Sequence, residues 1–149
     1  MYKILFVCTG NTCRSPMAEY IAKHLVKKRG LCAEISSAGL YASENKPMSA
    51  NSEKALKTLG VEYNGEHLSR QFTGDMARDN DLVLTVTDDH KACIPIFLEN
   101  LFSLREFVGV EDVGDPYGSS EEVYVESAKA LYTAVEKIID KIVSAGVLK

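Results

Sequence analysis

Several residue types and patterns are missing from this sequence, and each absence narrows the possible functions. No tryptophan occurs among the 149 residues, and no apolar run approaches the roughly 20 residues that a membrane-spanning helix needs. The formal net charge of −4 lacks the basic excess of a nucleic-acid-binding protein, although it allows a small local anion site. No linker rich in glycine, serine or proline divides the chain. We therefore expect one domain over residues 1–149, with neither nucleic acid nor membrane among its partners.

Cysteine is scarce as well, with four residues in the whole chain: Cys8, Cys13, Cys32 and Cys93. Four cysteines would suffice for two disulfides in a secreted protein. The segment Met1–Val7, however, has the pattern of a strand and not that of a signal peptide. We therefore expect a cytoplasmic protein whose thiols are reduced.

Hydrophobic spacing and end signals predict strands that alternate with helices. Strands are expected at residues 3–7, 33–38, 81–86 and 101–104. Helices are expected from Ser15-Pro16 to about residue 29, over 47–59, from about residue 88 into the 90s, and near the C-terminus. Thr73 is expected to cap one further short helical turn. This alternation is typical of an α/β fold with a parallel sheet, in which ligands bind beyond the carboxyl ends of the strands.

The segment from Cys8 to Arg14 lies at one such strand end, immediately before a predicted helix. Free N–H groups at a helix start, together with the helix dipole, favour an anion there. Gly10 and Asn11 tolerate backbone angles that let a tight loop turn its N–H groups inward, and the planar fork of Arg14 suits two phosphate oxygens. The segment predicts a cradle for a tetrahedral oxyanion, formed by Thr9, Gly10, Asn11, Thr12, Cys13, Arg14 and Ser15.

The same surroundings would make Cys8 a nucleophile. A thiol near a helix N-terminus and an arginine is stabilised as a thiolate, and a thiolate facing the phosphorus of a phosphomonoester can attack it. Ser15 could donate its hydroxyl to the sulfur, while Arg14 would stabilise charge on the phosphoryl oxygens. A lone cysteine is more often a buried structural residue. Cys-x5-Arg-Ser-Pro at a strand-to-helix junction is hard to explain by packing, however, so we favour the catalytic interpretation.

Such chemistry also needs an acid to protonate the leaving group, and Asp115 is the candidate. It belongs to Asp115-Pro116-Tyr117-Gly118, where the proline stiffens a loop that carries a carboxylate and an aromatic ring. A sequence of this kind is usually only a turn. Its assignment as the general acid therefore depends on the cysteine loop elsewhere in the chain.

Taken together, these residues closely resemble the low-molecular-weight protein tyrosine phosphatase family, over essentially the whole chain. The resemblance rests on Val7-Cys8-Thr9-Gly10-Asn11-Thr12-Cys13-Arg14-Ser15-Pro16 and on Asp115-Pro116-Tyr117, which have the family's spacing. It implies a three-layer α/β fold with a four-stranded parallel sheet flanked by helices, and neither cofactor nor metal. It also implies a phosphocysteine on Cys8, with Asp115 acting first as acid and then as base. Phosphorylated protein substrates and inorganic phosphate as product follow from that activity.

The resemblance further implies a polar network that braces the loop. Asn11 matches the family's bracing asparagine, and Ser15 matches the donor to the thiolate. Ser37 matches the serine bonded to that asparagine, and His67 matches the histidine that completes the network. On the sequence alone, His67 would more often be an ordinary surface or core histidine.

Two further residues take roles from the resemblance. For Cys13 it implies a redox role, as the partner of Cys8 in a disulfide that protects the nucleophile from irreversible oxidation. The alternative for Cys13 is a packed apolar thiol. Tyr117 would form a wall of the pocket entrance, or would simply be a partly exposed turn aromatic. Cys32 and Cys93 are expected to be structural or surface cysteines.

Thr12 and the loop after the second strand depart from the tyrosine-directed pattern. Such members commonly carry isoleucine at the position of Thr12 and a tryptophan in the loop Gly39–Glu44, where this chain has Tyr41 as a pocket candidate. Threonine at this position resembles the bacterial branch that acts on phosphoarginine. Its smaller side chain makes room, and its hydroxyl can accept from a guanidinium, which Asp115 could also pair. The alternative is a neutral size change in a phosphotyrosine phosphatase, so we expect phosphoarginine, phosphotyrosine or both as substrates.

Two other functions fit parts of the pattern. Arsenate reductase shares the fold and the cysteine loop, but it needs two further cysteines, and the segment Val86–Cys93 contains only one. Pro16 also replaces the glutamine that usually follows Arg-Ser in those enzymes. A phosphocarrier or non-catalytic phosphate-binding module would have no use for Asp115, and a carrier would not need Arg14. The presence of both residues favours hydrolysis.

Overall fold

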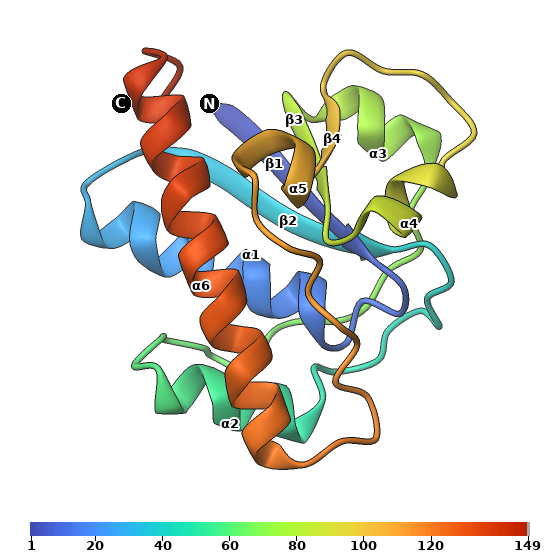
Figure 1. Ribbon diagram of the computed structural model, residues 1–149, viewed down its shortest axis with the longest axis vertical. Coiled ribbons are helices and arrows are strands. Elements are labelled where there is room, and N and C mark those ends of the chain that lie inside the picture. The colour runs from blue at the N-terminus through green and yellow to red at the C-terminus, as the bar shows by residue number, and fades with distance from the viewer. Residues whose placement is uncertain (149) are drawn as a thin grey trace.

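Each strand is followed by one or two helices, so the predicted α/β order is confirmed (Figure 1). The protein is described by a computed structural model over residues 1–148. The strands are β1 Tyr2–Cys8, β2 Ala33–Gly39, β3 Leu82–Thr85 and β4 Leu101–Ser103. The helices are α1 Arg14–Lys28, α2 Ala50–Thr58, α3 Gly74–Asp79, α4 Asp88–Ala92, α5 Leu104–Val108 and α6 Glu121–Ser144.

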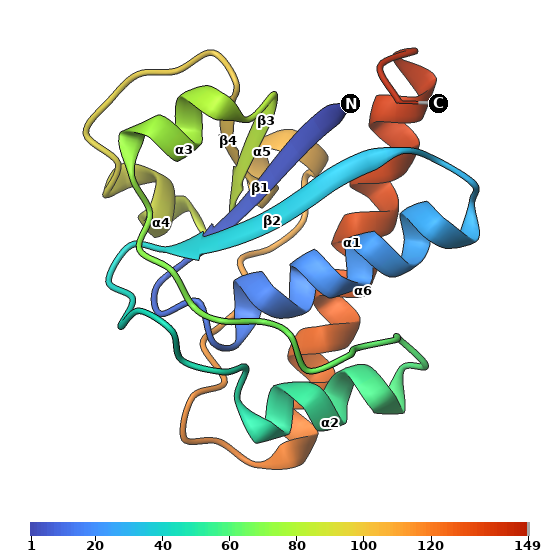
Figure 2. The same cartoon turned by 180° about the vertical axis from the view of Figure 1, so that it is seen from behind.

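The four strands form one parallel sheet in the order β2-β1-β3-β4. In the central strand β1, Cys8 lies opposite Gly39 of β2, and Val7 lies opposite Thr85 of β3. Because all four strands run in the same direction, their carboxyl ends lie at one edge of the sheet. The chain leaves β1 at this edge through the loop Thr9–Cys13 and enters α1 (Figure 2).

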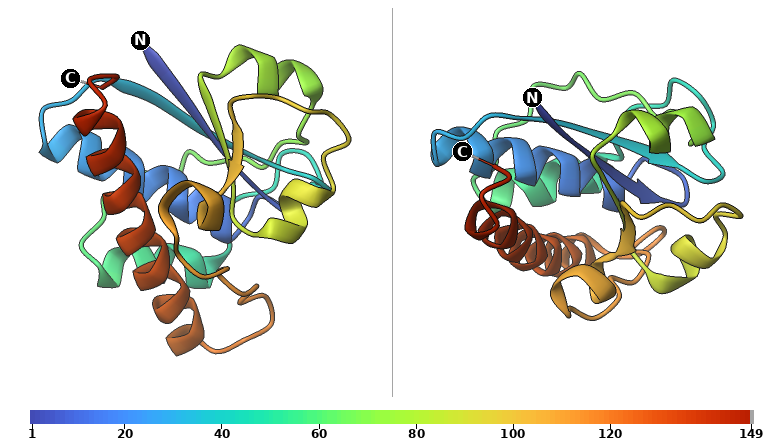
Figure 3. Two further views of the ribbon diagram at one scale, coloured as in Figure 1. Left: turned by 45° about the horizontal axis from the view of Figure 1, so that its top comes forward. Right: turned by 90° about the horizontal axis from the view of Figure 1, so that it is seen from above.

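Helices cover both faces of the sheet, which gives the predicted three layers (Figure 3). On one face, Ile4 and Phe6 pack in a large cluster with residues of α1, α2 and α6. On the other face, Leu5 and Val7 pack with Ala77 of α3. These four β1 side chains are at most 1% exposed, which explains why the strand is apolar at successive positions. Within residues 1–148, no helix has the length and apolar character needed to cross a membrane.

The start of α1 differs from the prediction. The helix begins at Arg14, with Cys13 as the N-cap residue, so Ser15 does not cap it. The hydroxyl of Ser15 instead contacts the sulfur of Cys8. Pro16 is therefore the third helical residue and not the first. It still lies in the first turn, where a backbone N–H would have no partner within the helix.

Two other elements are shorter than predicted because serine side chains cap helices there. The helix predicted over 47–59 is α2, whose start is set by Ser49, because the Ser49 hydroxyl accepts the N–H of Ser52 at 3.3 Å. The strand predicted over 101–104 ends at Ser103, which caps the short helix α5. No helix was predicted at α5, because a single turn leaves no hydrophobic period in the sequence.

Candidate active site

Cys8 is the last residue of β1 and is only 2% exposed. Its Sγ lies 2.9 Å from Oγ of Ser15 and receives the backbone N–H of Ser15 at 3.4 Å. This N–H is one of the free donors at the start of α1, where the helix dipole is positive. The structure therefore brings Cys8 and Ser15 together at the start of α1, where the sulfur contacts both the N–H and the hydroxyl of Ser15.

Gly39, and not Gly10, allows the loop to approach the sheet closely. Asn11 adopts the left-handed conformation as expected, with φ of 59°, but Gly10 does not. A Cβ on Gly10 would meet only Oγ1 of Thr12, at 3.9 Å. A Cβ on Gly39 would lie 2.6 Å from the carbonyl oxygen of Thr9 and 2.9 Å from the backbone nitrogen of Asn11. The prediction that Gly10 supplies special backbone angles is wrong, and the steric requirement falls on Gly39.

Gly39→Ala is therefore expected to displace the loop from β2. Overpacking of this kind costs about 1–3 kcal/mol, so we expect urea unfolding to show a decrease of about 2–3 kcal/mol in the free energy of unfolding. Gly10→Ala is the matched control, with an expected change below about 1 kcal/mol, because its Cβ has room. Equal losses in the two variants would contradict the close approach.

Asn11 is fully buried and fixes the loop through four hydrogen bonds. Its Nδ2 donates to Oγ of Ser15 and to Oγ of Ser37, both at 2.9 Å. Its Oδ1 accepts the backbone N–H of Arg70 at 3.0 Å, and its carbonyl oxygen accepts Nε2–H of His67 at 2.8 Å. The structure thus brings together all four residues of the implied bracing network. Because Ser15 accepts from Asn11, the Ser15 proton remains free to be donated to the sulfur of Cys8.

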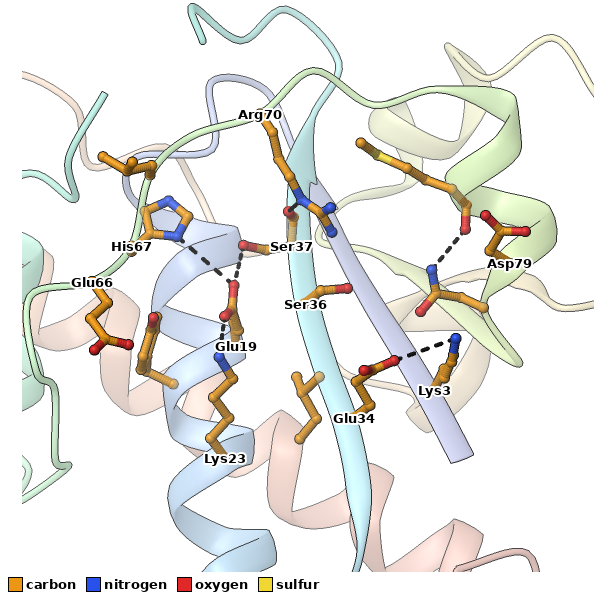
Figure 4. Close-up of a pocket in the computed structure, with 15 residues that line it drawn as sticks. Lys3, Glu19, Lys23, Glu34, Ser36, Ser37, Glu66, His67, Arg70 and Asp79 are labelled. Carbon is orange, nitrogen blue, oxygen red and sulfur yellow. Dashed lines mark hydrogen bonds and ion pairs between the residues drawn. The ribbon is translucent and has the colours of Figure 1, made fainter. Parts of the chain in front are cut away.

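Glu19 continues this network along α1 and was not predicted from the sequence (Figure 4). Its Oε1 accepts the hydroxyl of Ser37 at 2.6 Å, and its Oε2 pairs with Nζ of Lys23 at 2.6 Å. His67 Nδ1 lies 3.9 Å from Oε1. The carboxylate is 8% exposed, so Ser37 and Lys23 replace the water it has lost. The sequence did contain a signal for this role of Glu19, because a charged residue lies one helical turn after Ser15 in a largely apolar helix.

The pocket in Figure 4 is larger than the pocket at Cys8, about 480 Å³ against about 220 Å³, but it lacks a nucleophile of comparable reactivity. Two of its carboxylates are paired with its own lysines, Glu19 with Lys23 at 2.6 Å and Glu34 with Lys3 at 3.5 Å. It also lies beside α1 and β2, away from the thiol. Size alone would therefore choose the wrong pocket, and the chemistry favours the smaller one.

The smaller pocket contains the predicted catalytic residues, which come from two distant parts of the sequence. It is lined by Cys8, Thr9, Gly10, Thr12, Cys13, Arg14, Asp115 and Tyr117. Arg14 is buried, donates Nη1 to the carbonyl oxygen of Val113 at 3.0 Å, and places Nη2 at 3.8 Å from Oδ2 of Asp115. The Asp115 side chain is 53% exposed, so it can exchange protons with water and with a leaving group. Within the described residues, no group of three or more His, Cys, Asp or Glu side chains is arranged to hold a metal ion.

Only one of the two tyrosines predicted for the pocket lines it. Tyr117 does so, with its backbone N–H donated to Oδ1 of Asp115 at 3.1 Å and its ring 79% exposed. Tyr41 donates its backbone N–H to the carbonyl oxygen of Thr9 at 2.9 Å. Its ring, however, is 76% exposed and is not part of the pocket. The loop thus brings the backbone of Tyr41 to the site, and a pocket role for its side chain stays a prediction.

Cys13 lies in the pocket wall as a packed thiol that is 6% exposed. Its Sγ donates to Oγ of Ser49 at 3.5 Å and lies 3.7 Å from the hydroxyl of Tyr124. Burial, followed by the contact with Cys13, raises the pKa of Tyr124 to about 12, so this hydroxyl stays protonated. All four cysteines are free thiols, and Cys32 and Cys93 are exposed as expected. The disulfide between Cys8 and Cys13 stays a prediction.

His90 is a second residue of the site that was not predicted. It belongs to α4 and is 7% exposed. Its Nε2 lies 2.9 Å from Oγ1 of Thr9 and 3.4 Å from Nη2 of Arg14. Burial, followed by the charge of Arg14, lowers the pKa of His90 from 6.5 to about 4, so the ring is neutral at pH 7. The sequence signal was its position three residues after Thr87, which is the spacing of a capping box.

This lowered pKa makes a prediction about stability in acid. Between pH 6.5 and pH 4 the unfolded chain protonates His90 and the folded chain does not. The free energy of unfolding therefore decreases as the pH falls through this window, by up to about 3 kcal/mol from this group. Urea unfolding at pH 7 and pH 4.5 should show a larger loss in the wild type than in His90→Asn. Equal losses in the two proteins would contradict the burial of a neutral histidine.

The structure is an α/β protein with a parallel sheet, and its pocket brings Cys8, Arg14 and Asp115 together. The sequence model of the low molecular weight phosphotyrosine protein phosphatase family matches residues 3–147, and the chain belongs to this family. It is accordingly a cysteine-dependent protein phosphatase, with phosphorylated proteins as substrates.

Three relatives illustrate how similar the chain is to characterised proteins. The protein-arginine-phosphatase of Bacillus subtilis (strain 168) is 37% identical over 134 residues, which cover 86% of this chain and 88% of that protein. A low molecular weight protein tyrosine phosphatase from T. tengcongensis, solved by crystallography, is 39% identical with a TM-score of 0.88, covering 95% and 99% of the two chains. The YwlE arginine phosphatase, solved as a cysteine-to-serine mutant with a phosphorylated active-site serine, is 34% identical with a TM-score of 0.86, covering 94% and 95%. Overall identity therefore does not decide between arginine and tyrosine substrates.

Proposed function

We propose that this protein is a protein-arginine phosphatase that acts through a phosphocysteine on Cys8. The observation that carries the proposal is that Thr12 and Asp115 line the same pocket as Cys8. The nucleophile, a hydroxyl group and a carboxyl group thus surround a cavity of about 220 Å³. A phosphoarginine side chain needs each of them, because it presents a phosphoryl group and several N–H donors.

The reaction takes two steps. In the first, Sγ of Cys8 bonds to phosphorus as the phosphorus–nitrogen bond breaks, and Asp115 gives its proton to the departing nitrogen. Arg14 and the N–H groups of the loop stabilise the charge on the phosphoryl oxygens. In the second step, Asp115 takes a proton from the water that attacks phosphorus, and the sulfur departs as a thiolate beside Ser15. Inorganic phosphate is released.

Two features support arginine as the substrate residue. The Thr12 hydroxyl and the Asp115 carboxylate can accept guanidinium N–H groups, whereas a phenol ester has no such donors. The Bacillus subtilis relative is named as a protein-arginine-phosphatase, at 37% identity. The phosphorylated serine in the YwlE mutant supports a covalent intermediate at the corresponding cysteine of this chain.

Phosphotyrosine is the alternative substrate, and Tyr117 is the observation that favours it. Its ring is 79% exposed at the entrance of the pocket, where it can stack on the phenyl ring of a substrate tyrosine. The T. tengcongensis relative carries a tyrosine phosphatase name at 39% identity. An enzyme with this site could therefore accept both substrates at different rates.

Thr12→Ile tests the choice between these substrates. A lost hydrogen bond to a charged group costs about 1.5–3 kcal/mol, so kcat/KM for a phosphoarginine peptide should fall about 10- to 100-fold. For a phosphotyrosine peptide, kcat/KM should stay within about threefold, because the phenol does not use the hydroxyl. Thr12→Val is the matched control, since it removes the hydroxyl and nearly keeps the size. The same substrate preference in the wild type and both variants would contradict the proposal.

A further inference from the structure

The imidazole of His90 connects helix α4 to the candidate active-site loop. On one side, Nδ1 accepts the backbone N–H of Thr87 at 3.2 Å, in the capping box that starts α4. On the other side, Nε2 lies 2.9 Å from Oγ1 of Thr9. A backbone N–H can only donate, so Nδ1 carries no proton and the neutral ring has its proton on Nε2. His90 therefore donates to the hydroxyl of Thr9.

The Thr9 hydroxyl receives a second donor from the same side. Nη2 of Arg14 donates to Oγ1 at 3.3 Å. Arg14 Nη2 also lies 3.4 Å from Nε2 of His90, but two N–H groups that face each other do not bond, so Thr9 is the acceptor. Both lone pairs of Oγ1 are then occupied, and the hydroxyl proton is left for another acceptor. Because Thr9 is exposed and lines the pocket, its hydroxyl proton can be donated to an oxygen of a group bound there.

We propose that His90 is a positioning residue for the phosphoryl group, which it orients through the hydroxyl of Thr9 and beside the guanidinium of Arg14. This inference rests on the proposed function of the pocket. A donor held toward a phosphoryl oxygen contributes most when charge spreads over these oxygens in the transition state. Loss of His90 should therefore lower kcat and kcat/KM together and leave KM little changed.

The charges around His90 make this arrangement sensitive to acid. Arg14 on α1 faces the ring and opposes its protonation, whereas three carboxylates favour it: Asp89 on α4 and Asp112 and Asp115 on the segment before α6. Burial and Arg14 together outweigh the carboxylates. Protonation would break the hydrogen bond from the N–H of Thr87 to Nδ1, which is one of the two bonds of the α4 cap, and would place a second cation against Arg14. Wild-type kcat should therefore show an inflection in acid that a variant without the imidazole lacks.

Two substitutions separate the positioning role from the capping role. His90→Asn keeps an amide oxygen that can accept the N–H of Thr87, but its side chain is too short to reach Thr9. His90→Gln, with its amide N–H placed near the position of Nε2, gives up the side-chain bond to the N–H of Thr87 and keeps only the backbone bond from residue 90 to Oγ1 of Thr87. We expect kcat to fall about tenfold in His90→Asn and no more than about threefold in His90→Gln, with KM within about twofold in both. The melting temperature should change in the opposite order, with the larger decrease in His90→Gln.

A double-mutant cycle with Thr9→Val shows whether His90 acts through Thr9. In the Thr9→Val background, His90→Asn should lower kcat by less than about twofold. A tenfold loss in both backgrounds, or losses in kcat that simply follow the melting temperature, would overturn the proposal.

A binding measurement with an oxyanion distinguishes failure of this inference from failure of the proposed function. A wild type that hydrolyses neither phosphoarginine nor phosphotyrosine peptides would overturn the function and leave the cradle to be tested by binding. In calorimetry, His90→Asn should then bind orthovanadate, which can adopt the five-coordinate geometry of the transition state, about fivefold more weakly than the wild type, and His90→Gln within about twofold of it. Equal affinities in all three proteins would overturn the positioning role.

Discussion

Replacing Cys8 by serine is expected to lower kcat for both phosphopeptides by about 10⁴-fold or more. A serine hydroxyl is a much weaker nucleophile than a cysteine sulfur, and the sulfur here receives the N–H of Ser15 at 3.4 Å and lies 2.9 Å from its hydroxyl. The substitution changes little else, because oxygen is only slightly smaller than sulfur. Steady-state kinetics would measure the loss, and calorimetry should show that inorganic phosphate still binds.

Cys32→Ser is the matched control for this experiment. Cys32 is exposed and lies outside the pocket, so its replacement should leave kcat within about twofold. Activity of Cys8→Ser within tenfold of the wild type would contradict the role assigned to the sulfur of Cys8. The phosphocysteine mechanism would then have to be abandoned.

The second large effect is expected from Asp115→Asn, which should lower kcat by about 10²- to 10⁴-fold. The amide keeps the shape of the carboxylate and can still accept the N–H of Tyr117, which lies 3.1 Å from Oδ1 in the wild type. It has no proton to give to the leaving nitrogen and does not take one from water. Both chemical steps should slow, and the loss should be smaller for p-nitrophenyl phosphate, because its leaving group needs less protonation.

Asp112→Asn is the matched control on the same segment. The Asp112 carboxylate accepts the backbone N–H of Asp88 at 3.3 Å and lies 3.6 Å from Arg105, and it does not line the pocket. We expect kcat to stay within about threefold in this variant. Equal losses in the two variants, or an equal loss for both leaving groups in Asp115→Asn, would contradict the role of Asp115 as the acid.

Features that depend on neighbours in the sequence were predictable. The apolar run of β1 predicts burial on both faces, and Ile4 to Val7 are indeed at most 1% exposed. Thr73 predicts the short helix α3, because its hydroxyl can accept the N–H of Met76, which it does at 3.3 Å. The cysteine loop was also predictable, since its nucleophile, arginine and helix start follow one another along the chain.

Features that depend on strand pairing or on the direction of a side chain were not predictable. Gly39 matters because β2 pairs with β1 so that Gly39 lies opposite Cys8, and no local pattern reveals that register. His90 is separated from Thr9 by most of two βα units, and only the arrangement of β1 beside β3 brings them within 2.9 Å. For Tyr41, the sequence indicated the position of the backbone but not the direction of the side chain. Its backbone position was close to the site, but its ring faces solvent.

The most direct test of the central claim is to trap the phosphoryl group on the enzyme. Asp115→Asn is mixed with a phosphoarginine peptide, quenched in acid and digested, and the site of phosphorylation is located by mass spectrometry. The proposed mechanism predicts phosphate on the peptide that contains Cys8, and none when Cys8 is also replaced by alanine, which cannot attack phosphorus. Turnover without a phosphoenzyme, or phosphate on a different residue, would contradict it.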